Sequence, residues 1–193
     1  MTGCILKDKD VRDVLHKEVL GKYVNDPLTL VIDELGLLQG LCRVDIAVIN
    51  GIMHGYEIKS DADTLERLPM QAELYNKVLD KLTLVVGETH LNSAEEIIPK
   101  WWGIKVVSKT KGKTKIATHR KEKSNKDVDA LSVAELLWKQ EVVDILVEKG
   151  HEKKIFKHPK EILYHLLVEE CSLQEIKDTT RAILKNRTNW RDR

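Results

Sequence analysis

RVDIAVINGIMHGYEIK, residues 43–59, is the stretch that decides the fold. Two runs rich in β-branched and apolar residues, RVDIAVI and IMHGYEIK, flank the pair Asn50-Gly51. An Asn-Gly pair between two such runs is the strongest short hairpin signal that a sequence offers. We therefore expect two antiparallel strands, over residues 43–49 and 52–59, joined by a tight turn.

The sequence around this hairpin alternates between helical and strand patterns. Apolar residues recur at helical spacing in some segments, whereas residues 82–86 (LTLVV) form the continuous apolar run typical of a strand buried on both faces. This alternation predicts an α/β fold with a mixed central sheet flanked by helices. The expected helices cover residues 8–20, 70–80 and 93–99, and further strands lie near residues 29–32, 82–86 and 103–107.

From Asp127 onward the pattern is helical only. Capping boxes at Ser132/Glu135 and Ser172/Glu175 and a helix-starting Pro159 predict three helices, over residues 132–149, 159–170 and 173–186. We expect a core of residues 1–126 followed by an α-helical extension of residues 127–193.

The composition is that of an ordinary globular chain. Its 193 residues are 33% charged and 42% hydrophobic, with a net charge of +1, and suit one domain with an appendage. No apolar run is long enough to cross a bilayer, and the N-terminus lacks a secretory pattern. We expect a cytoplasmic protein without a membrane partner. Three cysteines without CxxC spacing argue against a zinc knuckle or a disulfide framework.

Positive charge is concentrated in residues 105–126, which contain eight lysines and Arg120 but only one acidic residue, Glu122. This local balance of +8 can attract phosphates, although a lysine-rich segment is also often only solvated. KTKGKTK, residues 109–115, is a candidate basic hairpin tip or a solvated loop. Trp101-Trp102 could stack on bases, but we interpret the pair as core. The candidate nucleic-acid-binding residues are Lys109, Lys111, Lys113, Lys115 and Arg120.

The chemistry-bearing residues lie in the expected hairpin. Asp45 is in its first strand, and Glu57-Ile58-Lys59 ends the second. Carboxylates hold Mg²⁺, which lowers the pKa of an attacking water and neutralises charge on the leaving oxygen. Lys59 projects from the same side as Glu57 and could orient the water or stabilise the transition state. Ile58 points into the core, which leaves its carbonyl as a possible further ligand. The alternative is an ordinary surface pair on an edge strand.

The register of the hairpin poses a difficulty for this site. A two-residue turn pairs Ile49 with Ile52, and this register places Glu57 on the face opposite Asp45. One extra residue must therefore be absorbed, either in a three-residue loop with a bulge or at Gly55. We predict such a bulge.

Asp45, Glu57-Ile58-Lys59 and Gln71-Ala72-Glu73-Leu74-Tyr75 resemble the Asp, (D/E)xK and QxxxY series of the RecB-like branch of PD-(D/E)xK nucleases. The longer run RVDIAVINGIMHGYEIKSDADTLERLPMQAELY, with LTLVVGETH and PKWWGI, resembles small bacterial and phage proteins assigned to that superfamily. The resemblance covers about residues 8–107 and weakens in the C-terminal helices. It implies a restriction-endonuclease-like core.

The resemblance also implies roles for single residues. Asp45 and Glu57 would bind the metal, Lys59 would assist the water, and Gln71 and Tyr75 would approach the site. The last two are spaced i, i+4, which equally suits plain packing. Glu34 resembles an additional upstream acid, and its alternative is an exposed glutamate at a strand end. The implied metal ligands are Asp45, Glu57, the Ile58 carbonyl and Glu34.

Together these features predict a Mg²⁺- or Mn²⁺-dependent nuclease that hydrolyses phosphodiester bonds, expected to be those of DNA, by metal-activated water. One alternative is a catalytically silent nucleic-acid-binding module that acts within a larger complex. Another is a protein-interaction adaptor built on the C-terminal helices. The sequence is compatible with a homodimer or a larger complex.

Overall fold

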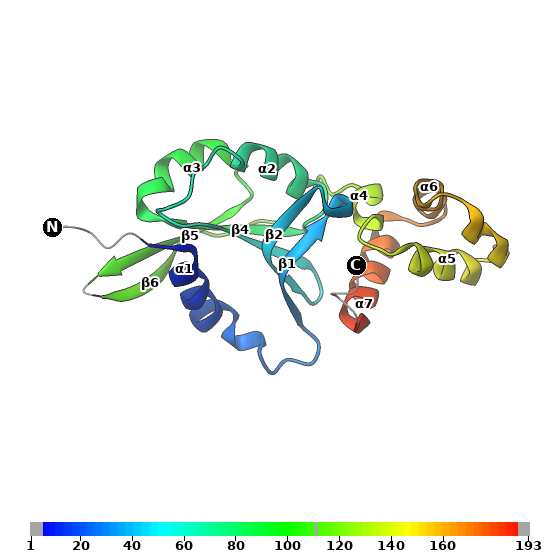
Figure 1. The fold of residues 1–193 in the computed structure, drawn as a ribbon, viewed down its shortest axis with the longest axis horizontal. Coiled ribbons are helices and arrows are strands. Elements are labelled where there is room, and N and C mark those ends of the chain that lie inside the picture. The colour runs from blue at the N-terminus through cyan, green and yellow to red at the C-terminus, as the bar shows by residue number, and fades with distance from the viewer. Residues whose placement is uncertain (1–5, 111, 189–193) are drawn as a thin grey trace.

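Six β-strands form one sheet, in the order in which the chain visits them. The computed structural model describes residues 6–110 and 112–188 (Figure 1). The strands are β1 (Leu30–Leu37), β2 (Cys42–Ile49), β3 (Met53–Lys59), β4 (Lys81–Gly87), β5 (Gly103–Thr110) and β6 (Lys113–Arg120). β3, β4 and β5 are parallel, and the other neighbouring pairs are antiparallel. The predicted mixed central sheet is therefore confirmed.

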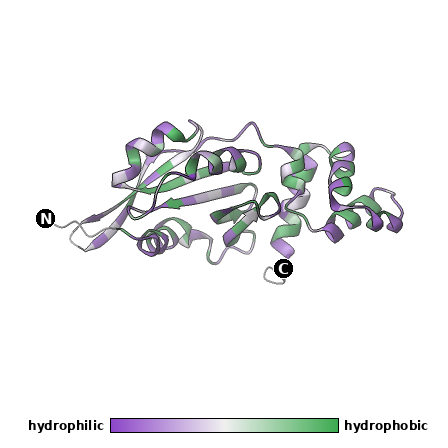
Figure 2. Ribbon diagram, turned by 45° about the horizontal axis from the view of Figure 1, so that its top comes forward, coloured by the Kyte–Doolittle hydropathy of each residue, from purple (hydrophilic) through white to green (hydrophobic). Residues whose placement is uncertain are grey.

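Helices cover both faces of the sheet (Figure 1). α2 (Leu68–Asn76) and α3 (Leu91–Ile97) pack on one face, where they connect the parallel strands. α1 (Asp8–Leu15) packs on the other, and the chain after it forms a π-helical turn, His16–Leu20, and a 3₁₀ turn, Gly21–Tyr23. Figure 2 shows hydrophobic residues running along the central strands, as expected of a sheet covered twice. Two further 3₁₀ turns span Leu38–Gly40 and Glu88–His90.

A three-residue loop between β2 and β3 absorbs the extra residue. Ile49 pairs with Met53, so the turn contains Asn50, Gly51 and Ile52, and the three-residue loop, the first of the two alternatives, is confirmed. The Gly55 alternative was wrong, because Gly55 pairs with Ala47 and the register does not shift within the pairs from 46 to 56. This register sets Asp45 at the level of Glu57.

Gly55 serves close packing instead of a bulge. A Cβ added to it would lie 2.6 Å from Cδ1 of Leu79 and 3.2 Å from Cγ2 of Val44, and both of these side chains are fully buried. Gly55→Ala is therefore expected to lower the free energy of unfolding by about 1–3 kcal/mol, because the core must shift to admit the methyl group. Urea unfolding checks this, with Gly36→Ala as control, since a Cβ on Gly36 meets nothing within 4 Å. Equal stability of the two variants would contradict the prediction.

The C-terminal part is helical, as predicted, but it begins differently. The helices are α4 (Ala130–Ala134), α5 (Lys139–Glu148), α6 (Lys160–Glu170) and α7 (Leu173–Asn186), with a 3₁₀ turn at Lys153–Lys157. Pro159 precedes α6 and Ser172 caps α7 through its box with Glu175, so both predicted starts are confirmed. These helices share one hydrophobic core with the sheet.

The single helix expected over residues 132–149 was wrong, because it is two helices. Asp129 caps α4, with its carboxylate accepting the N–H of Ser132 at 2.8 Å, so the expected Ser132/Glu135 box does not start the helix. α5 begins after Trp138, whose N–H donates to the carboxylate of Glu141 at 2.6 Å. Residues 135–138, between the end of α4 and the start of α5, lie outside both helices.

The lysine-rich segment forms the expected hairpin of β5 and β6, with Gly112 near its tip at a φ of 75°. Trp102 is fully buried and Trp101 packs partly buried against the core, so the core interpretation of the pair is confirmed. Cys42 and Cys171 are free thiols, and Cys4 lies outside the described residues. Within residues 6–110 and 112–188, no helix combines the length and apolar character needed to cross a membrane.

Candidate metal centre

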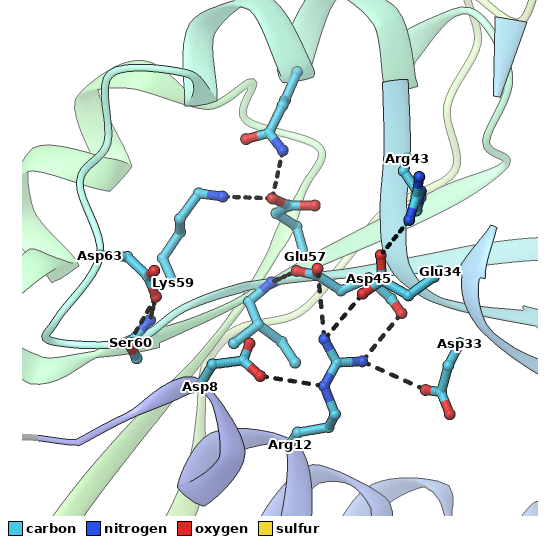
Figure 3. A network of polar contacts seen from close by, with 12 residues as sticks. Asp8, Arg12, Asp33, Glu34, Arg43, Asp45, Glu57, Lys59, Ser60 and Asp63 are labelled. Carbon is cyan, nitrogen blue, oxygen red and sulfur yellow. Dashed lines mark hydrogen bonds and ion pairs between the residues drawn. The ribbon is translucent and has the colours of Figure 1, made fainter. Parts of the chain in front are cut away.

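Three neighbouring strands carry a row of acids: Glu34 in β1, Asp45 in β2 and Glu57 in β3. The strand registers bring Glu34 to the level of Asp45 and Asp45 to the level of Glu57. Like charges opposite one another on adjacent strands are destabilising, so such a row needs cations to compensate it. Figure 3 shows the row with Lys59 at one end and Arg12 at the other.

Glu57 lies at the centre of a buried hydrogen-bond network. Its side chain is 2% exposed and that of Lys59 is 6% exposed. The Lys59 ammonium donates to Oε1 of Glu57 at 2.5 Å, and Nε2 of Gln71 donates to the same oxygen at 2.6 Å. The Tyr75 hydroxyl lies 2.8 Å from Oε2 of Glu57. The four residues of the expected (D/E)xK and QxxxY patterns that carry these groups thus meet in space.

The Tyr75 hydroxyl has one proton and two acceptors, since the Arg43 carbonyl lies 2.6 Å from it. Burial, and then the charge of Glu57, raise the pKa of Tyr75 far above its ordinary value, so the phenol stays a proton donor. On Gln71, the Oε1 atom is buried and has no hydrogen-bond partner within the described residues. A buried acceptor left open in this way can receive a hydrogen bond from a ligand or a water.

Asp45 is less buried, with a side chain 22% exposed. Its Oδ2 atom accepts the backbone N–H of Ile58 at 2.6 Å, and Ile58 itself points into the core under α1, as expected. Burial and then the charge of Glu57 raise the pKa of Asp45 to about 7. The ionised form of Asp45 is therefore unfavourable next to Glu57 in this buried site, and a bound cation would stabilise it.

This raised pKa predicts that Asp45 makes the fold less stable as the pH rises. The folded chain binds the Asp45 proton more tightly than the unfolded chain, so the stabilising contribution is complete below pH 3.8 and is lost as the pH rises through about 7. We expect a loss on the order of 2 kcal/mol, after discounting for partial exposure. Urea unfolding of the wild type and Asp45→Asn between these pH values measures it. Parallel stability curves for the two proteins would contradict it.

Glu34 stands in the left-handed region, with a φ of 63°, inside β1. A non-glycine residue in this conformation is strained, and such strain clusters at functional sites. Its carboxylate is 46% exposed and faces two guanidinium groups, those of Arg12 at 3.3 Å and Arg43 at 3.5 Å. Glu34 is thus exposed, as the alternative interpretation expected, but it lies within β1 and not at its end, and it is part of the acid row.

Arg12 is the site residue that sequence reasoning missed. It projects from α1 to the acid row, where its guanidinium contacts Asp33, Glu34 and Asp45 (Figure 3). Its place on the polar face of a helix 33 residues before Asp45 gave no signal of this contact. Arg43, exposed in β2, was also missed, because its contact with Glu34 depends on the pairing of β2 with β1.

A pocket of about 520 Å³ opens over the row. The expected site residues Asp45, Glu57, Ile58, Lys59, Gln71 and Glu34 all line it. The fully buried Tyr75 lies beneath and reaches the site through its hydroxyl.

The oxygens of this pocket suit a magnesium ion, which keeps several of its waters, better than a metal ion whose ligands all come from the protein. Among residues 6–110 and 112–188, no group of three or more His, Cys, Asp or Glu side chains is arranged to hold a metal. Mg²⁺, however, is commonly bound by one or two carboxylates and keeps several waters. Oδ1 of Asp45 accepts no hydrogen bond among the described residues and has the Arg12 guanidinium 3.6 Å away, and Oε2 of Glu57 has a remaining lone pair, so both oxygens can take a metal ion. The residues therefore fit such an ion.

The candidate nucleic-acid-binding residues lie in different settings. Lys113 and Lys115 are exposed on β6, whereas Lys109 pairs with Asp10 at 3.6 Å. The Arg120 guanidinium is held within the protein, by the carbonyls of Trp102 and Pro99 and by Glu95, so its contacts are structural. Lys111 lies outside the described residues.

The sheet, the acid row and the buried lysine define a mixed α/β protein with a candidate metal centre. The chain belongs to the bacteriophage P4 protein cII family, whose profile matches residues 9–192. It is similar to Protein cII of Enterobacteria phage P4, with 22% identity over 185 residues, which cover 95% of this chain and 68% of that protein. A solved structure of a protein of unknown function from Silicibacter pomeroyi has 14% identity and a TM-score of 0.44, over 77% of this chain and 97% of that one. At that TM-score the similarity supports no inference.

Proposed function

We propose that the chain is a Mg²⁺- or Mn²⁺-dependent nuclease that hydrolyses phosphodiester bonds, with DNA as its substrate. The observation behind the proposal is that Asp45, Glu57 and Lys59 share one pocket, next to Gln71 and Tyr75 from α2. A restriction-endonuclease-like core accounts for this arrangement of a hairpin followed by a helix and a parallel strand. Surface acids and lysines do not need a buried network of this kind.

Asp45, Glu57, the Ile58 carbonyl and Glu34 would hold the metal ion. When bound, the ion would lower the pKa of an attacking water and neutralise charge on the leaving oxygen. Tyr75 and Gln71 fix the Glu57 carboxylate through the bonds described above, so Glu57 keeps its orientation without a ligand. Such preorganisation lowers the reorganisation needed during reaction.

Lys59 supplies a positive charge beside the same pocket. Its ammonium is buried and directed at Glu57, and a lysine has three protons to donate, so it can hold Glu57 and a second acceptor together. A water or a phosphate oxygen next to Glu57 would be that second acceptor. Lys59 would then orient the water or stabilise the charge of the transition state.

The test is a cleavage assay with purified full-length protein on single- and double-stranded DNA and RNA. We expect DNA cleavage with Mg²⁺ or Mn²⁺, none with EDTA, and none by Glu57→Ala with either metal. Cleavage that persists both in EDTA and in Glu57→Ala would show that this site is not responsible.

One observation favours a second function, a catalytically silent nucleic-acid-binding module. Three donors already contact the Glu57 carboxylate, and the described residues contain no group of three metal-binding side chains. The exposed Lys113 and Lys115 of the hairpin would then provide the phosphate contacts. Salt-sensitive DNA binding without turnover, and without metal binding at millimolar Mg²⁺, would favour this function over the nuclease.

A further inference from the structure

We propose that the positively charged Arg12 guanidinium competes with the divalent metal ion for Glu34 and Asp45. Because Arg12 lies on α1, this helix sets the affinity of the site for the metal ion. This inference rests on the proposed function, because it assumes that the acid row binds a metal ion. Arg12 lies on α1, outside the hairpin and α2, and its effect on the metal affinity of the site can be measured.

The Arg12 guanidinium occupies the part of the row that Lys59 does not reach. Its Nη2 atom lies 3.3 Å from Oε1 of Glu34 and 3.6 Å from Oδ1 of Asp45. Its Nη1 atom lies 3.5 Å from Oδ1 of Asp33 and 3.3 Å from the Asp45 carbonyl. One cation thus serves acids of two strands (Figure 3).

The Asp45 oxygen that faces Arg12 is also the one that a metal would take. Oδ2 accepts the Ile58 N–H at 2.6 Å, whereas Oδ1 has the guanidinium at 3.6 Å as its neighbour. A metal ion on Oδ1 would place two cations side by side, and like charges at such distances repel each other. The two therefore bind competitively.

The contacts of Arg12 with the acids are long enough for a metal ion to replace the guanidinium. All of its distances to the acid row are 3.3 Å or more, longer than the 2.7–2.9 Å or so of strong charge-assisted hydrogen bonds. The helix itself stays in place, because Val11, Val14 and Leu15 are buried in the core under the sheet. Asp8, one turn earlier, lies 3.3 Å from Nε of Arg12 and offers it a partner when the row takes a metal.

The experiment measures Mn²⁺ binding by the full-length protein, by calorimetry and by the electron paramagnetic resonance signal of free Mn²⁺. Arg12→Gln is expected to bind Mn²⁺ about tenfold more tightly than the wild type, because one competing charge is removed. Arg12→Lys, which keeps the charge, should stay near the wild type. Lys17→Gln, which removes the same charge from an exposed position after α1, should leave the affinity unchanged.

Thermal unfolding separates this role from a purely structural one. Without metal, Arg12→Gln should melt below the wild type, because the acids lose their counter-ion, and Mn²⁺ should raise its melting temperature more than it raises that of the wild type. An equal metal-induced shift, or an unchanged or weaker Mn²⁺ affinity in Arg12→Gln, would overturn the inference while leaving the nuclease proposal standing. Failure of both proteins to bind millimolar Mn²⁺ would overturn both. Tighter binding by Arg12→Gln without DNA cleavage by the wild type would support the inference and contradict the proposed function.

Discussion

Asp45→Asn is expected to reduce metal-dependent DNA cleavage about a thousandfold while leaving the protein at least as stable as the wild type at neutral pH. The amide keeps an oxygen that can accept the Ile58 N–H, so the local hydrogen bond survives. It removes the charge whose burial raises the pKa of Asp45 to about 7, and with it an electrostatic cost. Initial cleavage rates under Mg²⁺ and urea unfolding of the same samples measure the two effects.

The opposite directions of these effects make the result specific. A variant that is inactive because it unfolds would lose both cleavage activity and stability. A variant that lacks one metal ligand of a destabilising acidic site loses only cleavage activity. Asp13→Asn, the same substitution at an exposed position of α1, serves as the control and should leave both quantities unchanged. Cleavage by Asp45→Asn within tenfold of the wild type would contradict a role for this carboxylate.

Asp80→Ala is expected to lower the free energy of unfolding by about 3–5 kcal/mol, the largest effect on stability that we expect of a single substitution here. Asp80 is 6% exposed and lies directly before β4, where its Oδ2 atom accepts the Met53 N–H at 2.7 Å. Its carboxylate also pairs with Lys177 and Arg181 of α7. Alanine would leave the buried Arg181 and the partly buried Lys177 without this counter-ion. Thermal and urea unfolding measure the loss.

Asp178→Ala is the matched control for this prediction. Asp178 also pairs with Arg181, but its side chain is 60% exposed, so water replaces the lost contact and the destabilisation should be far smaller. If the Asp80 and Asp178 variants were equally stable, the buried network would not hold α7 to the sheet. If Asp80→Ala instead unfolded in two separate transitions, the helical extension would be an independent unit and not part of the shared core.

Local patterns predicted the two strands of the hairpin correctly, and the side chains of Glu57, Lys59, Gln71 and Tyr75 lie together in the structure. The apolar runs on either side of Asn50-Gly51 specify two strands, and the need to bring Asp45 and Glu57 to one face correctly required an extra residue. Which of two sites would take that residue could not be decided locally. Gly55, one of these two sites, is instead required by packing, because the side chain of Leu79, from the segment between α2 and β4, lies where a Cβ of residue 55 would stand.

Contacts between distant segments account for what the sequence did not predict. At the break between α4 and α5, Arg187 from the end of the described chain stacks on Trp138 and donates to the Leu136 carbonyl at 3.2 Å. Helical periodicity through residues 132–149 carries no trace of that partner. Arg12 was missed for the same physical reason, because only the docking of α1 under the sheet brings it to the acid row.

In the described part of the chain β6 is the outermost strand on its side of the sheet, and this position affects how the hairpin lysines should be studied. The unpaired backbone groups of an edge strand can pair with a strand of another chain, and lysines on the edge strand oppose such self-association. Neutralising Lys113 and Lys115 to test DNA binding would therefore also encourage oligomers, and these could mimic or mask a loss of affinity. Replacing both with glutamate would remove the attraction for phosphate and keep the strand charged, so that the nucleic-acid effect can be measured on dispersed protein.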